Sequence, residues 1–167
     1  MSKRTILLYP DSRLHTVAAP VAQVNDEIRN LIKDMAETMY AAPGVGLAAT
    51  QIDVHLRIIV VDTSPARDQL CALINPKIVE ADGIADCEEG CLSVPGVYEK
   101  VKRAQHIRVH ALGPDGVSFE RDATGLDAVC IQHEMDHLDG KVFVEKLSRL
   151  KQQRILARIR KRQREDA

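Results

Sequence analysis

The segment CIQHEMDHLDG, residues 130–140, places two histidines four positions apart, with a glutamate directly after the first. Four residues are about 400° of helical rotation, so His133 and His137 point about 40° apart on one face of a helix. Both imidazoles can therefore reach one metal ion, while Glu134 can lie beside the ion without binding it. This spacing is typical of a metal hydrolase, and it requires a helix that is packed inside the fold.

The helix is predicted over residues 126–138, with Thr124 as its N-cap and Asp127 completing a capping-box-like pair. Its apolar stripe continues into the histidines, which are therefore expected to point inward. A pair of hydrogen-bonded core histidines is the alternative, and ligand spacing argues against it. The stripe consists of Leu126, Val129, Cys130, His133 and His137.

A catalytic metal ion needs a third protein ligand and an open position. Downstream, Asp139 falls on a different helix face and Glu145 has no recognisable spacing. The better candidates lie upstream in CEEGCLSVPG, residues 87–96, where Cys91 competes with Cys87. A free cysteine is more often a small buried hydrophobic residue, so the residues alone leave this choice open.

The remaining pattern predicts an α+β fold, with short antiparallel or mixed sheets packed around the helix that carries HEMDH. A first helix is expected over residues 26–40 with Asn25 as its N-cap, and a third after Ser148. Strands are expected at residues 56–63, at LCALINP, near residue 79, at residues 106–112 and at residues 117–120. The GPDG at residues 113–116 is a hairpin turn between the last two.

No apolar run is long enough to span a membrane, and ILLY is too short for a secretory signal core. We therefore expect a cytoplasmic protein with reduced cysteines. Residues 149–167 carry eight Lys or Arg and two acids, whereas the other 148 residues carry 15 basic and 22 acidic side chains. We expect a single domain at residues 1–147 and a basic helical extension at residues 148–167.

Three motifs, in this order, resemble those of the peptide deformylases: GVGLAATQ at residues 44–51, EGCLS at residues 89–93 and QHEMDHLDG at residues 132–140. The likeness continues through YPDSRL, LINP and KQQRI, so it covers nearly the whole chain. Together these motifs are highly specific.

The resemblance implies that Cys91, His133 and His137 bind the metal. It implies an enzyme that removes the N-formyl group from formyl-methionine at the start of new polypeptides and releases formate. Water on the metal would attack the formyl carbon, with Glu134 as general base and acid. The natural ion of the family is Fe²⁺, and Zn²⁺, Ni²⁺ or Co²⁺ can occupy the same site.

The resemblance also assigns the groups that would hold the substrate. Gln51 and the backbone N–H of Leu92 would form the oxyanion hole. Leu126, Val129 and Cys130, helped by Val45, would wall an apolar pocket for the methionine side chain. The backbone that would pair with the peptide lies at Val45, Gly46, Glu89 and Gly90.

A zinc endopeptidase with a downstream third ligand is the alternative enzyme, and a non-catalytic metal- or ribosome-binding protein is the alternative outside enzymes. The presence of Gln51, Glu134 and every expected ligand argues against the second. We further expect a monomer whose basic C-terminal helix docks on the ribosome, because its charge suits RNA phosphates and the substrate is a chain leaving the ribosome.

Overall fold

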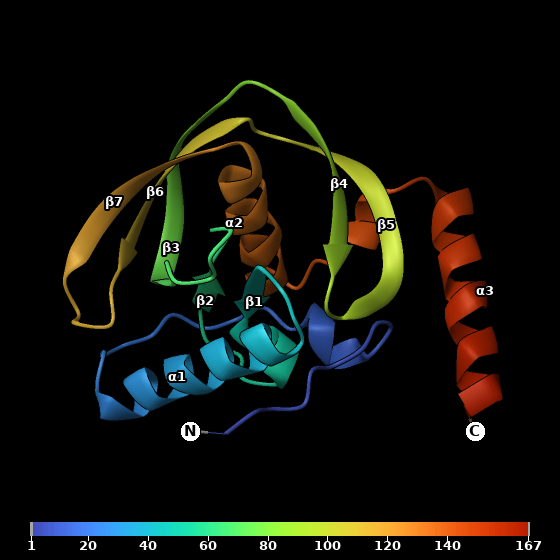
Figure 1. The fold of residues 1–167 in the computed structure, drawn as a ribbon, viewed down its shortest axis with the longest axis horizontal. Coiled ribbons are helices and arrows are strands. Elements are labelled where there is room, and N and C mark those ends of the chain that lie inside the picture. The colour runs from blue at the N-terminus through green and yellow to red at the C-terminus, as the bar shows by residue number, and fades with distance from the viewer. Residues whose placement is uncertain (1, 167) are drawn as a thin grey trace.

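The computed structural model describes residues 2–166, which fold into two β-sheets, three α-helices and three short 3-10 helices (Figure 1). The α-helices are α1 (Asp26–Ala41), α2 (Gly125–Leu138) and α3 (Arg149–Asp166). The strands are β1 (Gly46–Ala48), β2 (Ile58–Val61), β3 (Cys71–Asp82), β4 (Ala85–Cys91), β5 (Val94–Arg103), β6 (His106–Leu112) and β7 (Ser118–Thr124). The 3-10 helices span Ser12–His15, Ala49–Ile52 and Phe143–Lys146.

Five strands form an antiparallel sheet in the order β1-β2-β3-β6-β7, and β4 and β5 form a separate antiparallel pair. In Figure 1 the helix α2 runs between the larger sheet and the β4–β5 pair. The expected α+β architecture with a central helix is therefore confirmed. The hairpin over GPDG is confirmed as well, since Gly113 N–H donates to the Val117 carbonyl across the turn.

The strand β5 corrects the sequence-based prediction, which placed no strand over these residues. Its buried residues are Val94, Val97, Val101 and Arg103, which do not alternate strictly with exposed ones. A strand that alternates its two faces shows a period of two, and β5 lacks this signal.

The two faces of the larger sheet are covered by different helices. On one face Ile59 and Leu73 pack in a core cluster with Ile131 of α2. On the other face Ile58 and Ile74 pack with residues of α1, among them Met35 and Met39. Because both faces are buried, β2 reads as the continuous apolar run IIVV.

The starts of the helices differ from one another in how they are capped. Asn25 accepts a hydrogen bond from Ile28 N–H, 3.0 Å, as predicted for α1. Thr124 precedes α2 but its side chain makes no capping bond, so the capping-box expectation was wrong. Asp127 instead binds the Arg121 side chain at 2.7 Å and is drawn toward β7.

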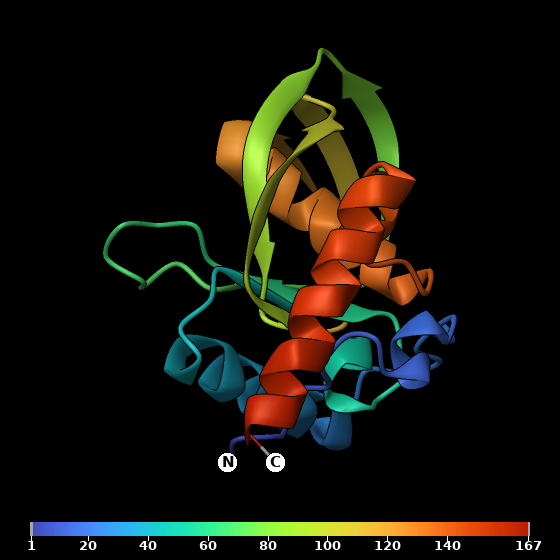
Figure 2. The same cartoon turned by 90° about the vertical axis from the view of Figure 1, so that its right-hand side faces the viewer.

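The third helix, α3, runs along the outside of the molecule beside β5 (Figure 2). Its Ile155 is buried in a cluster with Val97, Val101 and Phe143. Most of its other side chains are exposed, which explains why its sequence is so polar. No helix within residues 2–166 is long and apolar enough to cross a membrane.

Candidate active site

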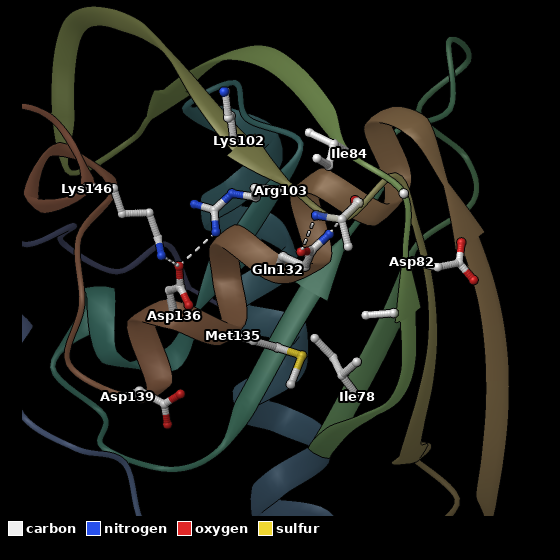
Figure 3. Close-up of a pocket in the computed structure, with 13 residues that line it drawn as sticks. Ile78, Asp82, Ile84, Lys102, Arg103, Gln132, Met135, Asp136, Asp139 and Lys146 are labelled. Atoms are coloured by element: carbon white, nitrogen blue, oxygen red, sulfur yellow. Dashed lines mark hydrogen bonds and ion pairs between the residues drawn. The ribbon is translucent and has the colours of Figure 1, made fainter.

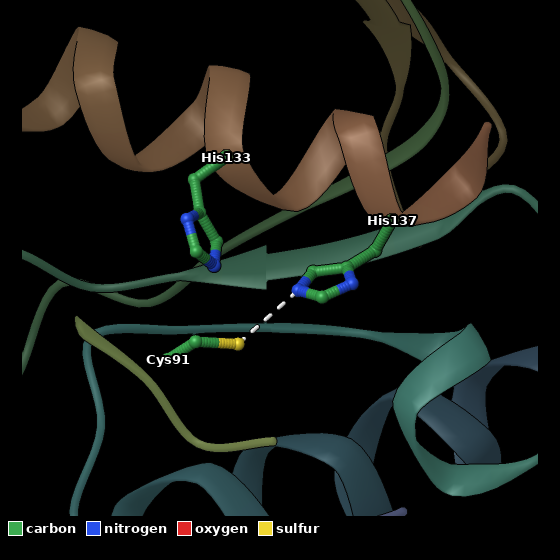
Figure 4. A group of neighbouring side chains, drawn as sticks. All are labelled: Cys91, His133 and His137. Atoms are coloured by element: carbon green, nitrogen blue, oxygen red, sulfur yellow. Dashed lines mark hydrogen bonds between the residues drawn. The ribbon is translucent and has the colours of Figure 1, made fainter. Parts of the chain in front are cut away.

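Three potential metal ligands meet where the end of β4 approaches the inner face of α2. Cys91, His133 and His137 offer ligand atoms that all lie within 4.8 Å of one another (Figure 4). The sulfur of Cys91 is 3.4 Å from Nε2 of His137. Within residues 2–166 this group contains Cys91 and not Cys87, which favours Cys91 as the third ligand.

The orientation of His133 is fixed by a buried carboxylate. Its Nδ1 lies 2.8 Å from Oε1 of Glu89, so its Nε2 is the nitrogen left for a metal ion. Burial lowers the pKa of His137, which keeps that ring in the neutral form that binds metals. One thiol and two imidazoles so arranged fit a tetrahedral site with one open position.

Glu89 belongs to a chain of ion pairs that sequence reasoning missed. Arg103 donates to both carboxylate oxygens of Glu89, at 2.5 and 2.9 Å, and to Asp136 at 2.8 Å. Lys146 lies 3.4 Å from the same oxygen of Asp136. Figure 3 shows Arg103 and Lys146 reaching Asp136 from opposite sides. The side chains of Glu89 and Arg103 are each only 4% exposed, so this pair is inside the protein.

The ion-pair chain ends in a depression of about 520 Å³ on the outer side of α2 (Figure 3). Its lining includes Met135, on the face of α2 turned away from His133, and Asp139, which directly follows the helix. The depression is therefore separate from the group of metal ligands.

Glu134 stands beside the ligand group in an apolar position. Its Oε1 is buried and, among residues 2–166, has no hydrogen-bond partner. Burial raises the pKa of Glu134 to about 7, although the positive charges of His133 and Arg103 oppose this. A carboxyl group with a pKa near neutrality can accept a proton and later return it.

Gln51 connects the first motif to the cysteine. Its Oε1 accepts from Ala48 N–H at 2.9 Å, which orients the amide so that Nε2 points at Ser93 Oγ, 3.0 Å, and at the Cys91 sulfur, 3.6 Å. Ser93 is fully buried and was not predicted as part of the site. Leu92 follows Cys91 in the tight turn between β4 and β5.

A cleft of about 780 Å³ opens beside these groups. Residues 42–46 line one wall, residues 90–92 and 94–98 line the opposite wall, and Glu134 lies between them. Val45 lines the cleft and is 38% exposed. The cleft thus brings together Val45, Gly46, Gly90, Cys91 and Leu92, as the motifs predicted.

One wall of the cleft is the open edge of the larger sheet. β1 is the edge strand, and Asp62 N–H donates to the Val45 carbonyl at 2.8 Å. In an antiparallel ladder that bond makes Gly46 and Val61 a non-hydrogen-bonded pair, so the backbone groups of Gly46 turn away from β2. An extended peptide can add to such an edge.

The inward-facing stripe expected for α2 needs correction at its first residue. Leu126 is 55% exposed, because the first turn of α2 extends past the core, whereas Val129 and Cys130 are buried. The downstream acids that an endopeptidase would use are engaged elsewhere. Asp139 pairs with Arg57 at 2.9 Å, and Glu145 accepts from Val142 N–H at 2.8 Å.

A sequence model of the polypeptide deformylase family matches residues 3–153. The chain belongs to the polypeptide deformylase family. Enzymes of this family are metal-dependent and remove the N-formyl group from nascent peptides, and this is the activity of the chain.

The similarity to individual deformylases extends over the full length. The chain is 61% identical over 164 residues to peptide deformylase 2 of Nitrosomonas europaea, covering 98% of this chain and 89% of the relative. The crystal structure of a peptide deformylase from Legionella pneumophila is 45% identical, with a TM-score of 0.94 and coverage of 99% and 98%. That of Ehrlichia chaffeensis in complex with actinonin is 39% identical, with a TM-score of 0.94 and coverage of 98% and 99%.

Proposed function

We propose that deformylation occurs at the group formed by Cys91, His133 and His137, with Fe²⁺ as the resident ion. The observation that carries this proposal is the convergence of the three donor atoms beside a buried glutamate at the end of a peptide-sized cleft. The donor set also suits Zn²⁺, Ni²⁺ and Co²⁺, and the choice of Fe²⁺ rests on the family. When bound, the ion acts as a Lewis acid that lowers the pKa of water and polarises the formyl oxygen.

Glu134 is the proposed general base and acid. Its carboxylate takes a proton from the attacking water, and its raised pKa lets it return that proton to the departing amine. Its position against Gly46 at the base of the cleft places it next to the first residue of a bound peptide.

Gln51 and the backbone N–H of Leu92 are the proposed donors to the developing oxyanion. The amide of Gln51 is already oriented by Ala48, so little reorganisation is needed during the reaction. The Gln51 amide makes a long, weak contact with the Cys91 sulfur and a shorter hydrogen bond with Ser93. The developing oxyanion is proposed to replace the weaker contact, with the sulfur.

The peptide is proposed to bind as an added strand. The backbone around Val45 and Gly46 pairs with the peptide through the groups of Gly46 that turn away from β2, and the Glu89–Gly90 segment pairs with it from the opposite side. Leu126, Val129 and Cys130, together with Val45, form the proposed apolar surroundings of the methionine side chain. Cys130 supports this role, since its sulfur is 3.5 Å from the Val45 carbonyl.

The C-terminal helix is proposed to dock on the ribosome, as an extension, residues 148–167, of a catalytic domain formed by residues 1–147. Ile155 anchors α3, while Arg154, Arg158 and Lys161 are exposed and can face phosphates. Arg162 is partly engaged, because it donates to the Pro95 carbonyl at 3.3 Å.

The experiment that tests the catalytic proposal uses anaerobically prepared protein, formyl-Met-Ala-Ser as substrate and metal analysis of the same sample. We expect Glu134→Gln to keep the metal and to lose about 10²-fold or more in kcat. Glu27→Gln, which changes an exposed glutamate on α1, is the matched control. Near-normal turnover by a metal-loaded Glu134→Gln variant would refute the assignment.

A further inference from the structure

The connection between β2 and β3, residues 62–70, is held in place by one buried carboxylate. Asp62 accepts hydrogen bonds from the Tyr40 hydroxyl at 2.6 Å, from Ser64 N–H at 3.0 Å and hydroxyl at 2.5 Å, and from Gln69 N–H at 3.1 Å. Burial opposes ionisation of Asp62, but these bonds lower its pKa to about 2. The connection therefore has a defined conformation, although it projects from the body of the molecule (Figure 2).

Arg67 lies in this connection and reaches back to the cleft wall. Its backbone has a φ of 59°, a left-handed conformation that is unfavourable for a residue with a side chain. Its guanidinium lies over the Tyr40 ring, 5.3 Å from the centroid, and donates to the Gly44 carbonyl. A cation stacked on an aromatic face has a restricted orientation, so the contact with Tyr40 orients the Arg67 guanidinium toward the Gly44 carbonyl.

Gly44 is part of the wall along which the peptide would lie. A Cβ at this position would be 2.7 Å from Cδ1 of Leu92, so the two walls are close together here. The Gly44 carbonyl accepts a hydrogen bond from the Arg67 side chain, and the Val45 carbonyl accepts one from Asp62 N–H. Through these two hydrogen bonds, the connection formed by residues 62–70 fixes the position of the cleft wall at Gly44 and Val45.

We propose that Arg67 is a positioning residue for the part of the substrate that follows its first amino acid, an inference that rests on the strand-addition mode of the proposed function. Gly46 lies against Glu134, so the first residue of the substrate binds at Gly46. Gly44 lies two residues, roughly 6–7 Å, further along an extended chain. Loosening Gly44 therefore weakens contacts with later substrate residues and leaves the reacting end in place.

The test compares two substrates on the metal-loaded enzyme: formyl-Met-Ala-Ser and N-formylmethioninamide. In Arg67→Ala we expect KM for the tripeptide to rise about five- to tenfold, the effect of losing about one backbone hydrogen bond to the substrate. We expect kcat to stay within about twofold, and both constants for N-formylmethioninamide to change by less than about twofold. A structural defect would affect both substrates alike.

Two further variants distinguish the loss of the Arg67–Gly44 contact from a general folding defect. Arg67→Gly relieves the left-handed backbone and should show the same dependence on substrate length. Arg29→Ala is the matched control, since Arg29 also donates to a backbone carbonyl, that of Pro114. Its constants should not change.

Equal losses on both substrates, or a fall in kcat alone, would overturn the role of Arg67. Absence of deformylation by the wild-type enzyme would overturn the proposed function instead, so the two failures are distinguishable.

Discussion

A Cβ atom at position 46 would lie 2.6 Å from Oε2 of Glu134. It would also lie 2.8 Å from the sulfur of Cys130. Both distances are shorter than real contacts of this type, so any residue other than glycine at position 46 displaces one of these side chains. The backbone of the cleft wall and the carboxylate of Glu134 are thus in direct contact.

Gly46→Ala should therefore lower kcat while the protein keeps its metal. A displacement of a general base by about 1 Å can cost about 10²-fold in rate. Gly113→Ala is the control, because its Cβ would also approach a carboxylate, that of Asp115, at 2.9 Å, in a turn outside the cleft. Unchanged kcat in Gly46→Ala would show that Glu134 has room to move without loss of function.

The assignment of the sulfur ligand predicts different behaviour for two cysteines of β4. Cys91→Ser should weaken metal binding or change the preferred ion, because a hydroxyl is a weaker and harder donor than a thiolate. Cys87→Ser should do neither. Absorption by the cobalt-substituted enzyme reports the sulfur ligand directly. A thiolate band that survives in Cys91→Ser and disappears in Cys87→Ser would reverse the assignment.

Removal of Arg103 should destabilise the protein strongly. Arg103→Leu leaves Glu89 buried without its cation, and breaking a buried pair costs about 3–5 kcal/mol. Arg108→Leu removes a partly exposed arginine that pairs with Glu80 and Asp122, each at 3.5 Å, and should cost much less. Urea unfolding of the metal-loaded variants measures both values. Similar losses of unfolding free energy in the two variants would show that burial of the Glu89–Arg103 pair is not important for stability.

His106 gives a prediction about pH. Hydrogen bonds to Asp122 and Asp82 raise the pKa of His106 above its usual value. A raised folded-state pKa stabilises the protein fully below the unfolded-state pKa of about 6.5, and this contribution is lost as the pH rises through the folded-state value. The difference in unfolding free energy between wild type and His106→Gln should therefore shrink as the pH rises above about 6.5. A difference that grows with pH would refute this account.

The proposed docking of α3 on the ribosome is best tested by removing positive charges from this helix. Replacing Arg154, Arg158 and Lys161 together by Gln leaves the buried anchor Ile155 in place. Co-sedimentation with ribosomes should fall, the salt dependence of binding should become less steep, and activity on formyl-Met-Ala-Ser should persist.

The control for that variant replaces three exposed lysines elsewhere, Lys33, Lys77 and Lys141, and changes the net charge equally. If both triple variants bind ribosomes as the wild type does, α3 is an ordinary surface helix.

The sequence predicted those parts of the fold and site that depend on local pattern. Helical spacing predicted α1 and α2, and the spacing of His133 and His137 predicted their shared face. The contact of Glu89 with Arg103 was not predictable. The strand register pairs Glu89 with Glu99 and Arg103 with Ala85, so the two side chains meet only by leaning toward each other along the strands.

The short length of β1 has a consequence for turnover. Three residues at an open edge can form only a few backbone hydrogen bonds with a peptide, and each contributes about 1 kcal/mol. A longer edge would bind the deformylated product more tightly and lengthen its residence time. In the proposed binding mode, the brevity of this strand favours rapid product release, while the proposed role of Arg67 keeps the few bonds aligned.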